Sequence, residues 1–171
     1  VAAAFTSAGI VEGQTRPAPG SAISTAAKCA ADLGRGQKSR RTFCDVLIAG
    51  SGPQSIVIAV PPHRGRPVLM FDLHNRFTVP PPGTAAADAF VRHVAVVHVV
   101  TAAGQIVERA IVAREFRTVA DLFDRIAAAP AGALRAVAPG FPEAVRVVLP
   151  ETAASVAIVG GRLEETTRAG Q

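Results

Sequence analysis

Three side chains that could share a metal ion or a proton alternate along one stretch of the chain: Asp72, His74 and Arg76. Residues two apart in a β-strand project from the same face, so a carboxylate and an imidazole would lie side by side. With His93 or His98 on a neighbouring strand, two histidines and one carboxylate could bind a metal ion. The competing interpretation is a solvated polar face that pairs its charges across strands. The first interpretation predicts a metal-binding protein or a metal-dependent enzyme.

Other catalytic patterns lack essential residues. The run 45–53 resembles the opening of a dinucleotide-binding Rossmann motif, with Gly50 and Gly52 in a turn after a strand. That motif needs a third small residue and then a helix whose N-terminus meets the phosphate, but Ser55 replaces the third glycine and a strand pattern follows. We therefore expect a hairpin turn there. No G-x-S-x-G elbow occurs and the acidic residues are scattered, so we assign no catalytic residue and expect no cofactor.

Two cysteines, Cys29 and Cys44, flank a polar segment. In an exported protein, an even pair at this spacing predicts one disulfide. Closing a loop of about 15 residues stabilises a fold by about 3 kcal/mol in the chain-entropy model. The alternative is a reduced pair in which Cys44 is a small core residue or, beside a histidine, a nucleophile. Two thiols without a second ligand pair do not make a closed zinc site.

Two clusters of basic residues could bind anions. The first lies between the cysteines and contains Arg35, Lys38, Arg40 and Arg41. The second lies in a turn before a predicted strand and contains Arg64 and Arg66. Such clusters bind phosphates or acidic polymers with little sequence preference and with strong salt dependence. Exposed loop charge without a ligand is the alternative interpretation.

The composition narrows the classes of function. The chain has 171 residues, of which 49% are hydrophobic, and this suffices for one domain with a core. It contains no Trp and no Tyr, which argues against surfaces that stack on sugars or bases. The net charge of +5 comes mainly from arginine and bears on association rather than on fold.

Short apolar runs between Pro- and Gly-rich turns predict seven or eight strands. The clearest runs are 43–49, 55–60, 68–79, 91–101, 106–116, 145–149 and 156–159. In the third run the apolar parity holds Leu69, Phe71, Leu73 and Phe77. Gly160 and Gly161 are expected to mark a bulge or a turn.

The segments 91–101 and 106–116 predict a hairpin around a four-residue loop. Paired residue numbers would then add up to 207. His98 would face Arg109, His93 would face Arg114, and Arg92 would face Glu115. The first segment is apolar on both parities, which predicts a strand that is buried on both faces.

One amphipathic helix is expected at 118–129. Thr118 and Asp121 form a variant of the capping box, and an apolar stripe follows at helical spacing: Val119, Leu122, Phe123 and Ile126. The early runs lack crossover helices, so a parallel sheet is disfavoured. The sequence therefore predicts a mainly β fold, an antiparallel β-sandwich or open barrel with this one short helix.

The first residues resemble the apolar core of a secretory signal peptide without its basic start, followed by a linker. They are too short for a spanning helix, which needs roughly 20 apolar residues. We expect a signal-peptide remnant and linker at 1–28, one β-sandwich domain at 29–164 and a polar tail at 165–171. On this interpretation, removal of residues 1–22 leaves the fold intact.

The predicted function is an exported, periplasmic or secreted binding or assembly module rather than a catalyst. Its partner would be a protein or an anionic polymer, with loops 61–67 and 80–90 and the sheet edges as contact surfaces. Edge strands can recruit a partner strand, which allows oligomers. No nucleic-acid partner is expected, because nucleic-acid binding conflicts with export, and the chain is not expected to be transmembrane.

Overall fold

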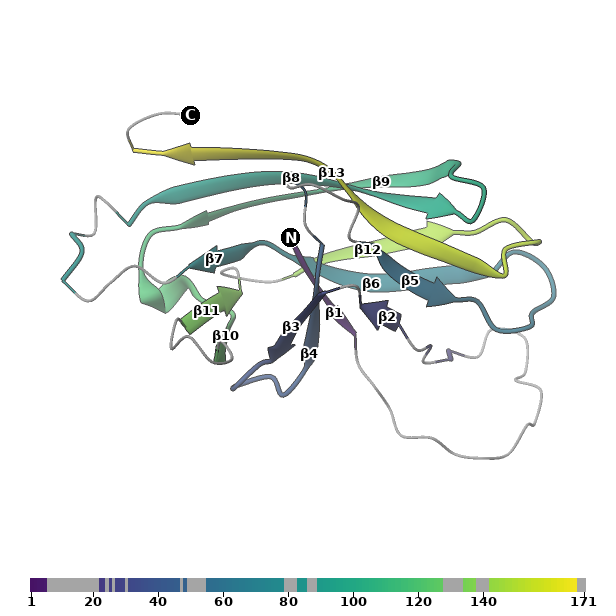
Figure 1. The fold of residues 1–171 in the computed structure, drawn as a ribbon, viewed down its shortest axis with the longest axis horizontal. Helices are drawn as coiled ribbons and strands as arrows, with labels where there is room; N and C mark the ends of the chain where they lie inside the picture. Colours follow the sequence, from purple (N-terminus) through teal and green to yellow (C-terminus); the bar gives the residue numbers. More distant parts are fainter. Residues whose placement is uncertain are drawn as a thin grey trace.

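The computed structural model shows a chain made mostly of antiparallel strands (Figure 1). It describes residues 1–5, 22–23, 25, 27–29, 31–46, 48, 55–78, 83–85, 89–127, 134–137 and 142–168. These residues form thirteen strands in three sheets, which confirms the mainly β, sandwich-like prediction but exceeds the expected seven or eight strands. The predicted turn at Gly50 to Pro53 lies outside the described residues.

Sheet A has the order β12-β6-β1-β4-β3, with every pairing antiparallel. Its strands are β1 (Ala2–Phe5), β3 (Ala31–Arg35), β4 (Thr42–Asp45), β6 (Val68–His74) and β12 (Glu143–Val148). Strand β1 lies between β4 and β6, so the start of the chain occupies the middle of this sheet. The predicted domain boundary at residue 28 stays a prediction.

Sheet B has the order β2-β5-β13-β8-β9 and contains the longest strands. Its members are β2 (Ala27–Cys29), β5 (Ile56–Ala59), β8 (Val91–Thr101), β9 (Ile106–Phe116) and β13 (Ser155–Thr167). In Figure 1, β13, β8 and β9 form the upper layer and β6 and β12 lie beneath them. Strand β13 continues past Glu165, where the polar tail was expected to begin.

Sheet C is small and packs beside sheet A, with the order β10-β11-β7. Its strands are β7 (Arg76–Thr78), β10 (Asp124–Ala127) and β11 (Leu134–Val137). The one predicted run 68–79 is thus divided at Asn75, where the chain leaves sheet A and enters sheet C.

The main core lies between sheets A and B. The apolar side of the run 68–77 is buried as predicted. Leu69, Phe71 and Leu73 of β6 pack toward the inward-facing residues of β8, which are Ala95, Val97 and Val99. The other parity of β8 is only half-buried, so the expectation that this strand is buried on both faces is wrong. The outer face of sheet B has no layer of described strands over it, which leaves its valines partly exposed.

The hairpin of β8 and β9 confirms the predicted register along most of its length. His98 faces Arg109, His93 faces Arg114 and Arg92 faces Glu115. The register shifts between Val99 and Val100, near the turn. A second shift, at Gly160, confirms the predicted irregularity in β13.

The helix predicted at 118–129 is wrong. A single 3-10 turn, η1 (Val119–Asp121), is followed by an extended residue, Leu122, and then by β10. The capping interaction is present, because the Asp121 carboxylate accepts the backbone N–H of Thr118 at 2.7 Å. The helix does not continue because β10 pairs with β11 and buries Ile126 in a second core beside Leu33 and Phe43.

The predicted disulfide is present between Cys29 and Cys44. Cys29 lies in β2 of sheet B and Cys44 lies in β4 of sheet A, so the bond joins the two layers of the sandwich. The polar segment between the cysteines contains β3, the turn that follows it and the first half of β4.

Candidate functional site

His74, the central residue of the predicted metal site, is buried between β4 and the segment that precedes β10. Its side chain is 1% exposed and packs edge-on against Phe43, with ring centroids 5.7 Å apart, and against Phe123 at 4.6 Å. Burial lowers the pKa of His74 to about 4, although Asp72 opposes this shift. The imidazole is therefore neutral at neutral pH and sits in an aromatic environment.

Asp72 and Arg76 have charge partners elsewhere in the chain, Asp72 in the turn before β4 and Arg76 in β4 itself. The Asp72 carboxylate accepts a hydrogen bond from Arg41 Nη1 at 3.1 Å, and both side chains are about one-third exposed. Arg76 forms an ion pair with the buried Asp45 of β4. Asp72 and His74 share one face of β6, but Arg76 belongs to another sheet.

The other two histidines lie on opposite faces of β8. His93 points inward, where Nε2 donates to Glu165 at 2.8 Å and the ring stacks on Phe77 with centroids 4.3 Å apart. Burial lowers the pKa of His93, although the Glu165 hydrogen bond opposes this. His98 has the other parity and packs beside Gly161, where an added Cβ would lie 3.0 Å from the imidazole carbon Cε1.

The structure does not assemble the predicted ligand set of Asp72, His74, His93 and His98. In the described part of the chain, no group of three or more His, Cys, Asp or Glu residues could hold a metal ion. His93 and His98 belong to sheet B, whereas Asp72 and His74 belong to sheet A.

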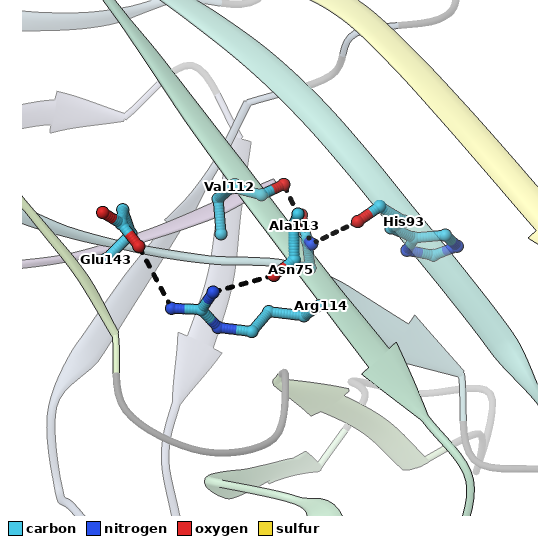
Figure 2. Close-up of polar contacts among 6 residues, drawn as sticks. All are labelled: Asn75, His93, Val112, Ala113, Arg114 and Glu143. Atoms are coloured by element: carbon cyan, nitrogen blue, oxygen red, sulfur yellow. Dashed lines mark hydrogen bonds and ion pairs between the residues drawn. The ribbon is translucent and has the colours of Figure 1, made fainter.

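Sequence reasoning missed Asn75, which connects the two layers. It is 1% exposed, and its Nδ2 donates to the backbone carbonyls of His93 at 3.1 Å and Val112 at 3.3 Å (Figure 2). Beside it, Arg114 of β9 reaches Glu143 of β12 at 3.2 Å, which links sheet B to sheet A. The available signal was the parity, since Asn75 is a polar residue in the apolar series from Leu69 to Phe77.

The first basic cluster forms a fixed turn at residues 36–41, between β3 and β4, which we call the basic turn. The Asp124 carboxylate accepts the backbone N–H of Lys38 at 2.9 Å and that of Ser39 at 2.8 Å. A Cβ on Gly36 would lie 2.1 Å from Asp124 Oδ2, so only glycine allows this approach. In addition, the N–H of Gln37 donates to the carbonyl of Arg125 at 2.9 Å.

The charges of the basic turn differ in exposure. Lys38 and Arg40 are exposed, as is the neighbouring Arg35, whereas Arg41 is paired with Asp72. A shallow hollow of about 210 Å³ lies beside the turn, and its lining includes Lys38, Phe123 and Arg125. The turn therefore presents several cations on a rigid backbone.

The second basic cluster lies on a separate loop. Arg64 and Arg66 are exposed there. The ring of His63 lies 2.8 Å from the carbonyl oxygens of Pro61 and Glu151, which attaches this loop to the segment before β13. Of the predicted contact loop 80–90, only residues 83–85 and 89–90 are described.

The longest edge strand of the described sheets is β9, with eleven residues. It pairs with β8 on one side, and no described strand pairs along its other side, which we call the β9 edge. The carbonyl of Ala113 accepts a hydrogen bond from the Arg114 side chain at 2.7 Å. Ile111, at the centre of the strand, is 59% exposed. A long strand with one unpaired side is a template for another strand.

Comparisons with protein-family models, curated proteins and solved structures find no match to this chain. Within the described residues, no helix has the length and apolar character needed to cross a membrane.

Proposed function

We propose that this protein is an exported binding or assembly module that recruits an extended partner segment to the β9 edge. The observation that carries the proposal is the eleven-residue edge strand with no described strand beside it and with Ile111 exposed at its centre. Unpaired N–H and C=O groups of such an edge bind a partner backbone, and alternate side chains select the partner sequence.

The sequence of the β9 edge supports this use. Proteins commonly protect an edge strand with proline, lysine or a bulge. From Glu108 to Phe116 the chain has no proline and no lysine, and the register shift lies outside this stretch, at the turn end of the hairpin. The edge does carry charges of both signs, so selectivity would depend on which charges the partner presents.

The disulfide supports the predicted compartment. A bond between Cys29 and Cys44 fits an oxidising environment, such as a bacterial periplasm or the cell exterior. The partner class that strand addition requires is a protein or a peptide, and the binding needs no cofactor.

A strand-recruitment experiment tests the proposal. A displayed library of random nonapeptides is selected on the full 171-residue chain, and amide hydrogen exchange is measured with each enriched peptide. We expect alternating apolar peptides that slow exchange in β9. Ile111→Lys should abolish binding because it places a charge at the centre of the edge.

The matched control is Met70→Lys, because Met70 is 72% exposed but lies in β6, between β12 and β1. This substitution should leave peptide binding unchanged. Enriched peptides that protect other strands, or binding that is insensitive to Ile111→Lys, would contradict strand recruitment at this edge.

The rigid basic turn favours a second candidate function, attachment to an anionic polymer. Asp124 holds the backbone of this turn, so Lys38 and Arg40 are presented with little loss of backbone freedom on binding. Dextran sulfate is a suitable probe. Lys38→Glu with Arg40→Glu should remove binding at low salt, whereas the control pair Arg64→Glu with Arg66→Glu, of equal charge change, should retain it. Equal losses in both variants would point to net charge alone.

A further inference from the structure

The outer face of β9 carries a row of side chains that is complementary to itself when reversed. All four side chains of the row are exposed: Arg109, Ile111, Ala113 and Glu115. Read backwards, it places a carboxylate opposite the guanidinium and a small residue opposite the large apolar one. Two antiparallel copies of this strand would therefore match at all four positions.

We propose that the partner at the β9 edge is β9 of a second copy of this chain. The two strands would run antiparallel about a two-fold axis at Val112, so that the two five-stranded B sheets become one continuous sheet. This inference rests on the proposed strand-recruitment function and names its partner.

This register pairs every charge of the outer row. Arg109 of one copy faces Glu115 of the other, and by symmetry the same contact forms twice. Ile111 faces the small Ala113, so the side chain that is 59% exposed gains a neighbour without crowding. Opposite charges directly across an antiparallel pair are stabilising, whereas like charges are destabilising.

Neighbouring registers lose this match. Sliding one copy by two residues in one direction brings Ile111 opposite its own copy and leaves Arg109 opposite Ala113, with no charge partner. Sliding it in the other direction brings Arg109 opposite Arg117, which is repulsive. A slip of one residue places outer-face side chains opposite inner-face ones, which strand pairing does not permit.

Two local interactions adjust when the copies pair. The Ala113 carbonyl now accepts a bond from Arg114 at 2.7 Å and would instead accept a backbone N–H of the second copy (Figure 2). Glu115 now pairs with Arg117 at 2.8 Å, with side chains 41% and 67% exposed. Such an exposed pair contributes little, so Glu115 can also bind Arg109 of the second copy at small cost.

Sedimentation of the full chain over protein concentrations from about 1 µM to 1 mM tests the inference, because this range covers weak protein–protein affinities. We expect a reversible dimer. Arg109→Glu, and separately Glu115→Arg, should weaken dimerisation at least tenfold, since each places like charges opposite one another twice. The double variant, with both reversals, should recover a large part of the lost affinity. Recovery is incomplete because Glu115→Arg also places like charges opposite Arg92 within the hairpin.

The control is Arg66→Glu, a charge reversal on an exposed loop residue, which should leave dimerisation unchanged. Thermal unfolding of each variant confirms that the fold is retained. A chain that stays monomeric, or a dimer that resists both single reversals, overturns the inference, as does a double variant that stays as weak as the singles. The variant Ile111→Cys tests the register directly. If it forms an intermolecular disulfide efficiently, the two copies pair Ile111 with Ile111, and the proposed register is wrong.

These results separate the inference from the function on which it rests. If the chain is monomeric but selected nonapeptides still protect β9 from exchange, strand recruitment stands and only the identity of the partner is overturned. If neither peptides nor a second copy protect β9, both proposals are wrong.

Discussion

Replacement of Gly36 by alanine should destabilise the fold by displacing the carboxylate that holds the basic turn. The added Cβ would lie 2.1 Å from Asp124 Oδ2 and 2.7 Å from Asp124 Cγ, well inside van der Waals contact. Asp124 is 2% exposed and belongs to β10, so its side chain has little room to move. The Ser39 hydroxyl, 2.8 Å from the same Cβ, can rotate away.

The cost follows from the hydrogen bonds that Asp124 must release. It accepts the N–H groups of Lys38 and Ser39 at 2.9 and 2.8 Å. A hydrogen bond to a charged group contributes about 1.5 kcal/mol or more, so two lost bonds predict a loss of about 3 kcal/mol in the free energy of unfolding. This is a large part of the roughly 5–15 kcal/mol that is typical of a domain.

A double-mutant cycle checks the cause. Urea unfolding is followed by far-UV circular dichroism, since the chain has no Trp or Tyr to report by fluorescence. Asp124→Ala by itself should cost about 3 kcal/mol for the same bonds. If the contact with Asp124 causes the loss, Gly36→Ala should cost little more in the Asp124→Ala background. Additive losses would show that Gly36 is needed for another reason, and the reasoning would fail.

Three further predictions concern stability. Burial lowers the pKa of His74 to about 4 from an unfolded value near 6.5, so the free energy of unfolding should fall by up to about 3 kcal/mol as pH drops from 6.5 to 4. His74→Leu should reduce this pH dependence, which urea titrations at several pH values would measure. The Cys29→Ser and Cys44→Ser double variant should lose about 3 kcal/mol for a loop of 15 residues, so an unchanged midpoint would argue against the cross-link in solution. Deletion of residues 1–5 should lower the melting temperature, because β1 pairs with both β4 and β6; an unchanged transition would instead support the linker interpretation.

The pH dependence has a second contributor at the basic turn. Burial by itself would raise the pKa of Asp124, but hydrogen bonds from Ser39, Lys38 and Arg125 outweigh burial and leave the pKa below its usual value. A carboxyl group whose pKa is lowered by folding stabilises the fold above its unfolded pKa, and this contribution disappears as pH falls below about 4. Asp124→Asn should therefore reduce the acid sensitivity in that lower window, whereas His74→Leu acts above it.

Local periodicity in the sequence was enough to predict the longer strands of sheets A and B. The alternation around Phe71 and the loop between the long strands predicted the core parity and the hairpin register, both of which are confirmed. These features depend on neighbours in the sequence, and the two-residue period of a strand records them directly. The disulfide was also predictable, because it needed only a pair of cysteines and an export interpretation.

Contacts between distant segments were not predictable in this way. The stripe that begins at Val119 has helical spacing, yet Val119 is 44% exposed and Ile126 is buried in an extended strand. The reason lies elsewhere in the chain, because β10 pairs with β11 and Asp124 binds a turn more than eighty residues earlier. Tertiary pairing of this kind overrides helix propensity, which is a weak preference. The same holds for His74, whose polar parity suggested solvent but which lies under Phe123.

The β9 edge shows how fold position, rather than local pattern, decides which residues can act. In the sequence, β8 is apolar on both parities, whereas β9 mixes apolar and charged residues. From the sequence by itself, β8 would therefore be the stronger candidate for binding a partner strand. In the fold, β8 is flanked by β13 and β9, and its backbone groups are already paired. The row from Arg109 to Glu115 becomes informative only because topology leaves that side of β9 without a described strand. Its charges then have two roles, since they discourage pairing with an arbitrary apolar strand and favour a strand that presents the same charges in reverse order.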